Sequence, residues 1–257
     1  MITAGIDIGS TTAKGAVLQD KRIEAVTVMP TGYDPKGAAE TLLEKLLEKT
    51  GLERQDVKAV VSTGYGRKNV AFADNSVTEI TCHAAGARLL NPNAATIVDI
   101  GGQDSKVVVL DNSGNVADFT MNDKCAAGTG RFLEVMASAL QIELTSLAEF
   151  SARADASVAI SNVCTVFAES EVISLISKGE KRENIIAGIH AAIGSRIASM
   201  AARVKARPPH MMTGGVALNQ GVVRVLEERF ENTVTVPNLA QINGAVGAAL
   251  IAADRNG

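Results

Sequence analysis

The chain has 257 residues, enough for one large domain or two smaller lobes, and 46% of them are hydrophobic and 21% charged, as in folded globular proteins. Aromatic residues make up only 3%, Trp is absent, and the formal net charge is -3. This composition and charge argue against a protein that binds nucleic acid by aromatic stacking or through a basic surface.

The sequence gives no sign of export or of a membrane anchor. Its first ten residues lack the basic and apolar segments of a secretory signal. The longest run of apolar or glycine residues, 244–253, is shorter than the roughly 20 residues that a membrane span needs. The three cysteines are odd in number and far apart, unlike a disulfide framework. We therefore expect a cytoplasmic protein with no membrane or nucleic-acid partner.

Two segments share one pattern, in which an apolar stretch ends in Asp, a glycine-containing turn follows, and a second apolar stretch begins. The first is DIGSTTAK at 7–14, and the second is DIGGQDSK at 99–106. Each predicts a β-hairpin whose turn carries a carboxylate. The repetition predicts two related lobes, which we place at residues 1–93 and 94–257.

The remaining elements alternate between strands and helices. In chain order, the patterns predict a strand at 22–29, a helix at 35–50, a strand at 57–63, a helix at 78–90, a strand at 116–121, helices at 130–140, 165–178 and 183–206, a short strand at 211–215, and a last helix at 241–253. This alternation predicts an α/β protein with helices packed on sheets.

Both hairpin turns contain the residue types that hold a phosphate chain and Mg²⁺. Glycine lets the backbone approach closely, hydroxyl and amide groups donate hydrogen bonds, and Asp7 and Asp99 can hold Mg²⁺ through water. The candidate phosphate contacts are Gly9, Ser10, Thr11, Thr12, Lys14, Gly101, Gly102 and Gln103. Gln103, with Asp7 and Asp99, is also a candidate catalytic group, and Asp104 is the alternative base.

A third glycine segment, MTGGV at 212–216, is a candidate adenosine contact through Gly214, Gly215 and Val216. Any one of these segments alone is more often an ordinary glycine hairpin, whereas three in this order favour a nucleotide site. The P-loop pattern is absent. Together with NGAVGAA at 243–249, the segments resemble the superfamily of actin, sugar kinases and heat-shock chaperones. That resemblance implies two ribonuclease-H-like (actin-like ATPase) lobes around a cleft that binds ATP or ADP with Mg²⁺.

Cys125 and Cys164 each directly precede a predicted helix. The helix dipole and free N–H groups stabilise a thiolate there, and they would also bond the sulfides of an iron–sulfur cluster. Burial as a small apolar residue is the commonest fate of a free cysteine, so both explanations stay open. Zinc is not indicated, because C-x-x-C is absent and the three His residues lack ligand spacing. Two thiolates are half of a four-thiolate set, so a cluster would need a second chain.

Long segments across the chain resemble the activator components of (R)-2-hydroxyacyl-CoA dehydratases, a family that includes the ATP-binding subunits of benzoyl-CoA reductase. They are GIDIGSTTAKG, STGYGR, VDIGGQDSK, MNDKCAAGTGRFLE and CTVFAESEVISLISKG. The resemblance implies an oxygen-sensitive ATPase and homodimer, with one 4Fe–4S cluster held by Cys125 and Cys164 of each chain. It implies delivery of a low-potential electron to a dehydratase, with a ferredoxin or flavodoxin as the reductant.

Three alternatives remain: a subunit of a benzoyl-CoA-type reductase, a small-molecule kinase of the same fold, and an actin-like assembly protein. The kinase would leave the cysteines without a role, and the assembly protein would need polymerising surfaces and no metal. Cys82 and His83 are adjacent, but a buried helix core is the better explanation than a metal or redox pair. The turn at 64–67 faces either the nucleotide or a partner, and the sequence does not decide between them.

Overall fold

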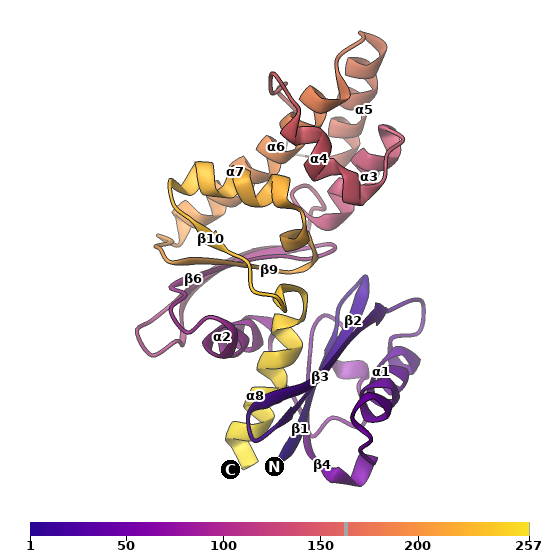
Figure 1. The fold of residues 1–257 in the computed structure, drawn as a ribbon, viewed down its shortest axis with the longest axis vertical. Helices are drawn as coiled ribbons and strands as arrows, with labels where there is room; N and C mark the ends of the chain where they lie inside the picture. Colours follow the sequence, from indigo (N-terminus) through magenta and orange to yellow (C-terminus); the bar gives the residue numbers. More distant parts are fainter. Residues whose placement is uncertain (162–163, 257) are drawn as a thin grey trace. The chain divides into compact units, whose positions relative to one another are not determined.

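The computed structural model describes residues 1–161 and 164–256, except for the side chain of Asn256. It contains two five-stranded sheets with helices packed on them, which confirms the α/β class (Figure 1). Contacts within the chain form two compact units: the first is Met1–Ala94, Leu110–Ala117 and the segment from Pro237 onward, and the second is Ala95–Val109 and Asp118–Val236. The expected division into two functional lobes, residues 1–93 and 94–257, stays a prediction.

The sheet of the first unit has the strand order β3-β2-β1-β4-β5. Strand β1 pairs antiparallel with β2 and parallel with β4. The strands are β1 (Ile2–Ile8), β2 (Thr12–Gln19), β3 (Arg22–Pro30), β4 (Val57–Thr63) and β5 (Asn75–Ser76), and the helices are α1 (Pro35–Thr50), α2 (Glu79–Leu90) and α8 (Asn243–Asn256).

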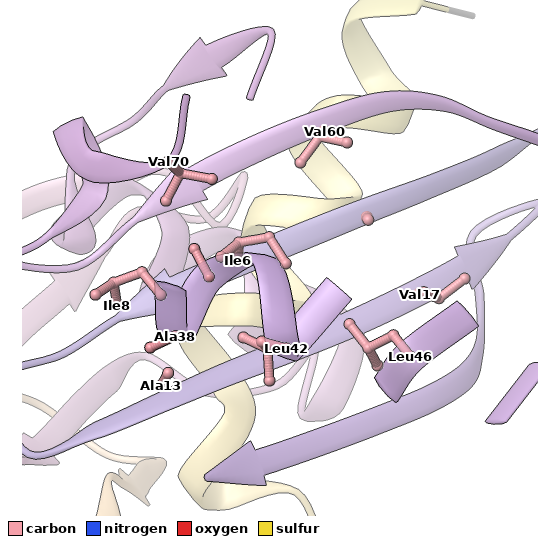
Figure 2. Close-up of a cluster of buried hydrophobic side chains, with 11 residues drawn as sticks. Ile6, Ile8, Ala13, Val17, Ala38, Leu42, Leu46, Val60 and Val70 are labelled. Carbon is pink, nitrogen blue, oxygen red and sulfur yellow. The ribbon is translucent and has the colours of Figure 1, made fainter. Parts of the chain in front are cut away.

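Helix α1 covers one face of this sheet. Asp34 caps its first turn, since the Asp34 carboxylate accepts a hydrogen bond from the Lys36 N–H, and Gly51 follows its last residue in the left-handed conformation. Because alternate residues of a strand point to opposite faces, the even-numbered apolar residues of β1 point toward α1. Figure 2 shows Ile6 in the buried cluster formed with Leu42 and Leu46 of the helix.

The opposite face of β1 receives helix α8 at very short range. A Cβ on Gly5 would lie 2.0 Å from the carbonyl oxygen of Ala245 and 2.4 Å from the amide nitrogen of Ala249. One position earlier on this face, the Thr3 hydroxyl donates a 2.9 Å hydrogen bond to the Ala249 carbonyl. Any side chain at residue 5 would therefore push α8 away from the sheet.

The sheet of the second unit repeats the arrangement of the first. Its order is β10-β9-β6-β7-β8, in which β6 pairs antiparallel with β7 and parallel with β9, as β1 does with β2 and β4. The internal repeat predicted from the two hairpins is thus confirmed. The strands are β6 (Thr96–Ile100), β7 (Ser105–Leu110), β8 (Val116–Asn122), β9 (His210–Thr213) and β10 (Val234–Thr235).

In the described part of the second unit, the α-helices are α3 (Gly130–Ala139), α4 (Leu147–Ala152), α5 (Thr165–Ser177), α6 (Arg182–Arg203) and α7 (Gln220–Phe230). Among the described helices, α6 alone has the length and hydropathy of a membrane span. Of its most apolar 18-residue stretch, 61% is buried inside the protein. It packs against α4 and α7, as expected of a core helix.

Candidate functional site

The first hairpin turn brings a buried carboxylate and a lysine together. Asp7 lies opposite Lys14 in the pairing of β1 with β2, and the lysine Nζ is 3.4 Å from the Asp7 carboxylate. The Gly9 N–H donates a 3.1 Å hydrogen bond to the Thr12 carbonyl and closes the turn, which leaves Ser10 and Thr11 exposed. The turn therefore offers exposed hydroxyl donors beside a buried carboxylate.

The second hairpin turn reproduces this geometry. Asp99 lies opposite Lys106 in the pairing of β6 with β7, again with 3.4 Å between the lysine Nζ and the carboxylate. The Gly101 N–H donates a 2.9 Å hydrogen bond to the Asp104 carbonyl, and Gln103 is exposed at the turn. One difference is that Lys106 is almost fully buried and also binds the Asp104 carboxylate at 2.7 Å.

Each unit also places a glycine with positive φ next to its hairpin. Gly64 follows β4 with φ +89°, and a Cβ there would lie 2.5 Å from Oδ1 of Asp7. Gly214 follows β9 with φ +86°, and a Cβ there would lie 2.2 Å from the carbonyl oxygen of Ile100. The turn that begins at Gly64, whose direction the sequence left open, therefore lies against Asp7. Only glycine allows both the conformation and the close approach.

Asp7 has two further neighbours that the sequence did not assign to the site. A Cβ on Gly244, in the first turn of α8, would lie 3.1 Å from Oδ2 of Asp7 and 3.4 Å from Nε2 of His83. The Asn243 amide donates to the His83 carbonyl oxygen at 3.0 Å and lies 3.1 Å from His83 Nδ1. Because the amide nitrogen can only donate, Nδ1 must accept, and the neutral ring carries its proton on Nε2. His83 is buried, as predicted, and its ring and the Asp7 carboxylate both border Gly244.

The candidate adenosine segment lies directly after β9. Gly215 is exposed, whereas Val216 is buried within the 3₁₀ turn Gly215–Leu218. A Cβ on Gly130, the first residue of α3, would lie 3.6 Å from a methyl carbon of Val216 and 3.2 Å from the Gly101 carbonyl oxygen. The structure thus brings the glycine segment, the second hairpin turn and the start of α3 together within one unit.

The second unit also contains the two candidate ligand cysteines. Cys125 is half-buried in the loop between β8 and α3, and Cys164 is half-buried as the residue that precedes α5. Helices α3 and α5 pack against each other. Within residues 1–161 and 164–256, no group of three or more His, Cys, Asp or Glu residues could hold a metal ion.

Cys82 differs from both of these cysteines. It is fully buried in the first unit, among apolar residues of β4, α2 and α8. Burial raises the pKa of its thiol to about 12, and the nearby charges of Asp7 and Glu79 add to the effect, although the Thr63 hydroxyl opposes it. The thiol is thus a core group.

A backbone link joins the second hairpin turn to the start of α3, the helix that follows the loop of Cys125. The N–H of Gly130 donates a 2.8 Å hydrogen bond to the Gly101 carbonyl, and the N–H of Arg131 donates one of 2.8 Å to the Gly102 carbonyl. These two N–H groups open α3 and have no partner within the helix, so the turn satisfies them. A change in the peptide orientation at Gly101 and Gly102 must therefore disturb the start of α3.

Comparison with known proteins assigns the chain to a family. Residues 4–252 match the BadF/BadG/BcrA/BcrD ATPase family. The chain is 47% identical over 255 residues to the 2-hydroxyisocaproyl-CoA dehydratase activator of Clostridioides difficile, covering 99% of this chain and 96% of that protein. It is 48% identical to the (R)-2-hydroxyglutaryl-CoA dehydratase activating ATPase of Acidaminococcus fermentans, covering 97% and 96%. A benzoyl-CoA reductase subunit from Thauera aromatica is more distant, at 35% identity over 99% of this chain and 94% of that protein.

Solved structures agree. The C. difficile activator with bound ADPNP has a TM-score of 0.93 at 46% identity and covers 99% of this chain and 95% of that one. Component A of the A. fermentans dehydratase has a TM-score of 0.94 at 45% identity, with 99% and 98% covered. A ROK family glucokinase from Streptomyces griseus shares the fold alone, at a TM-score of 0.60 and 14% identity over 99% of this chain and 100% of that one. With the repeated Asp–Lys hairpins, these matches establish that the chain is a member of the BadF/BadG/BcrA/BcrD ATPase family.

Proposed function

We propose that this protein is the ATP-hydrolysing activator of a (R)-2-hydroxyacyl-CoA dehydratase, to which it delivers a low-potential electron. Two relatives at 47% and 48% identity over nearly the whole chain are named as dehydratase activators. The reductase alternative has less support, because its relative is 35% identical. The kinase alternative rests on a likeness of fold at 14% identity.

The proposed nucleotide site uses both hairpin turns. Asp7 and Asp99 hold Mg²⁺ through water, and the phosphates bind Gly9, Ser10, Thr11, Thr12, Lys14, Gly101, Gly102 and Gln103, while Gly214, Gly215 and Val216 contact adenosine. The buried carboxylates, the exposed turn hydroxyls and the lack of room for a Cβ at Gly101 and Gly214 support this assignment. Gln103 is the candidate for orienting the attacking water, because its exposed amide lies on the second turn.

The donor set of the second unit fits half of a 4Fe–4S cluster. Cys125 and Cys164 are two half-buried thiols, and two chains would supply the four thiolates that such a cluster takes. The residues after Cys164 support a second copy at this place, since Val166 and Phe167 are each 65% exposed although apolar. When bound, the cluster would supply one-electron chemistry to the partner, with a ferredoxin or flavodoxin as the reductant in the cytoplasm.

The backbone link between the second turn and α3 is the observation that carries this proposal. Gly101 and Gly102 belong to the proposed phosphate contacts, and their carbonyls hold the first two N–H groups of the helix that follows Cys125. Exchange of ATP for ADP changes which groups the turn binds, so the nucleotide alters the position of the Cys125 loop. The chain's own residues thus couple hydrolysis to the electron-donating site.

Two sets of variants test the proposal. Asp7→Ala should abolish Mg²⁺-dependent ATP hydrolysis while anaerobically prepared protein keeps about four iron atoms per dimer. Cys125→Ala or Cys164→Ala should lose the iron, the absorbance near 400 nm and the activation of the dehydratase, but should still bind ATP. Each protein is mixed with a dehydratase, ATP and a strong reductant without oxygen, and enoyl-CoA formation is followed. Full activation by an iron-free cysteine variant would falsify the electron-donor function.

A further inference from the structure

Asn122, the last residue of β8, holds the loop that contains Cys125. Its side-chain amide nitrogen donates a 2.8 Å hydrogen bond to the Cys125 carbonyl oxygen and lies 3.4 Å from that of Ala127. Both oxygens can only accept, so the amide nitrogen must face the loop and the amide oxygen must face away from it. One half-buried side chain therefore ties two peptide groups around the cysteine.

Arg196 of α6 contacts the same residues from a different element. One terminal guanidinium nitrogen is 3.4 Å from Oδ1 of Asn122. The aliphatic stem of the arginine packs against Gly128, where a Cβ would lie 2.6 Å from Cδ of Arg196. Gly128 also has φ +82°, so both its conformation and its contact with the arginine require glycine.

A cavity of about 300 Å³ lies beside this contact. Its lining includes Asn122 and Arg196 together with the exposed Arg203, two helical turns further along α6. Arg203 has the same charge and lines the same cavity, and it contacts neither the loop nor Asn122 in any hydrogen bond or ion pair found among the described residues. The chain therefore provides a matched control for the effect of charge alone.

We infer that Asn122 is a positioning residue for Cys125, and that Arg196 fixes the orientation of the Asn122 amide. The inference rests on the proposed function, in which Cys125 is a cluster ligand. The contacts of Asn122 with the loop and with Arg196 are observed in the single chain. A loop tied at the carbonyls of Cys125 and Ala127 presents its thiol in one conformation. Without these bonds the loop samples others, in which the thiol is more exposed and holds iron less well.

Three variants separate the two contacts. Asn122→Asp places an oxygen where the amide nitrogen faced two carbonyls, so both loop bonds are lost while Arg196 gains a charged partner. Arg196→Met keeps the aliphatic stem against Gly128 but removes the guanidinium. Arg203→Met is the control. Thermal unfolding confirms that each variant is folded.

The first measurement uses the iron-free protein and does not depend on activity. Native protein is treated with a thiol reagent, and modification of Cys125 and Cys164 is timed separately by mass spectrometry. Asn122→Asp should speed the modification of Cys125 by about fivefold, the factor expected for the loss of the 2.8 Å hydrogen bond to the Cys125 carbonyl, because the 3.4 Å contact with Ala127 adds little. Arg196→Met should speed it less, and Arg203→Met should not change it. Cys164 should react at the wild-type rate in all three variants.

The second measurement follows iron release to a chelator from the anaerobic dimer. Release should accelerate in the same order, with Asn122→Asp fastest and Arg203→Met unchanged. Equal rates for Asn122→Asp and wild type, or equal acceleration at both cysteines, would overturn the inference. If Asn122→Asp does not fold, Arg196→Met and Arg203→Met are compared instead. Faster modification of Cys125 in Arg196→Met alone would support the inference, and equal rates in the two variants would overturn it. A wild-type protein that takes up no iron would refute the proposed function, whereas the thiol rates would still decide the role of Asn122.

Discussion

The hydroxyl of Thr213 donates a 2.7 Å hydrogen bond to the carboxylate of Asp99, which is 3% exposed. Thr63 occupies the same position beside Asp7, because each threonine lies opposite its aspartate in a parallel strand pair. Yet no hydrogen bond from the Thr63 hydroxyl to Asp7 is found among the described residues, and this hydroxyl lies instead against the Cys82 thiol, whose pKa it lowers. The two hairpins therefore share a backbone plan but differ in how the carboxylate is held, since the second adds a hydroxyl and a nearly buried lysine.

This difference predicts unequal effects of one substitution. Thr213→Val should lower the free energy of unfolding by about 1.5–3 kcal/mol, because it removes a hydrogen bond to a buried charged group. Thr63→Val should cost less than about 1 kcal/mol, since the Thr63 hydroxyl faces the neutral Cys82 thiol rather than the carboxylate of Asp7. Urea unfolding of both variants checks the pair. Equal losses at the two positions would show that Thr213 does not stabilise Asp99.

Acidification should destabilise the protein through His190. Burial lowers the pKa of this histidine from 6.5 to about 4, and the positive charge of Arg224 adds to the effect. Between these values the unfolded chain binds a proton that the folded protein does not, so stability is complete above pH 6.5 and falls as the pH drops toward 4. The loss from this group should be about 3 kcal/mol.

The measurement for His190 is the free energy of unfolding across that pH range. His190→Gln should remove most of the dependence of the unfolding free energy on pH. A smaller dependence of the same sign should remain, because burial also lowers the pKa of His210. The wild-type slope persisting undiminished in His190→Gln would contradict the assignment.

The three cysteines should differ in reactivity. Because burial raises the pKa of Cys82 to about 12, its thiol should stay unmodified in native iron-free protein at pH 8. Cys125 and Cys164, which are half-buried, should react. All three should react after unfolding, as mass spectrometry of the labelled protein will reveal. Cys82→Ala should keep the iron content and the ATP hydrolysis of the wild type. Rapid native labelling of Cys82 would show that the core around it opens.

Alanine substitutions at Gly179 and Gly214, which have similar φ angles, compare the cost of backbone strain with the cost of steric overlap. Gly179 has φ +79° and nothing within 4 Å of the position that an added Cβ would take, so Gly179→Ala should cost about 1 kcal/mol of unfolding free energy. Gly214 has φ +86° but would place its Cβ 2.2 Å from the Ile100 carbonyl oxygen. Gly214→Ala should therefore cost several times more and weaken ADP binding, as measured by urea unfolding and calorimetry. Similar costs at both positions would mean that the backbone at residue 214 can move freely.

Much of the fold was predictable because its signals are local. The two D-x-G hairpins predict an internal repeat, and the observed strand orders of both sheets confirm it. Helix α7 was missed although its signals are present, since Asn219 caps its first N–H groups and Val222, Val223 and Leu226 follow at helical spacing. The short strands β5 and β10 have two residues each, too few for a pattern to form.

The parts of the site that could not be predicted depend on contacts between distant segments. The small residues of α8 predict a helix, but nothing local indicates that Ala245 lies against Gly5. His83 is buried as expected, and only the fold brings it close to Asp7 and Asn243. The bonds from Gly130 and Arg131 to the second turn join backbone groups, which leave no signature in the order of side chains.

The close fit of α8 on β1 also constrains how the protein emerges during synthesis. The strands of the first sheet are made early, but the helix that packs against Gly5 follows only after the whole second unit has been translated. Until then the face of β1 opposite α1 is uncovered, and its apolar neighbours in β2 and β4 are exposed to other chains. Aggregation therefore competes with folding most strongly after the N-terminal sheet has been made and before α8 has been made. A chaperone that covers apolar surface would act mainly in that interval.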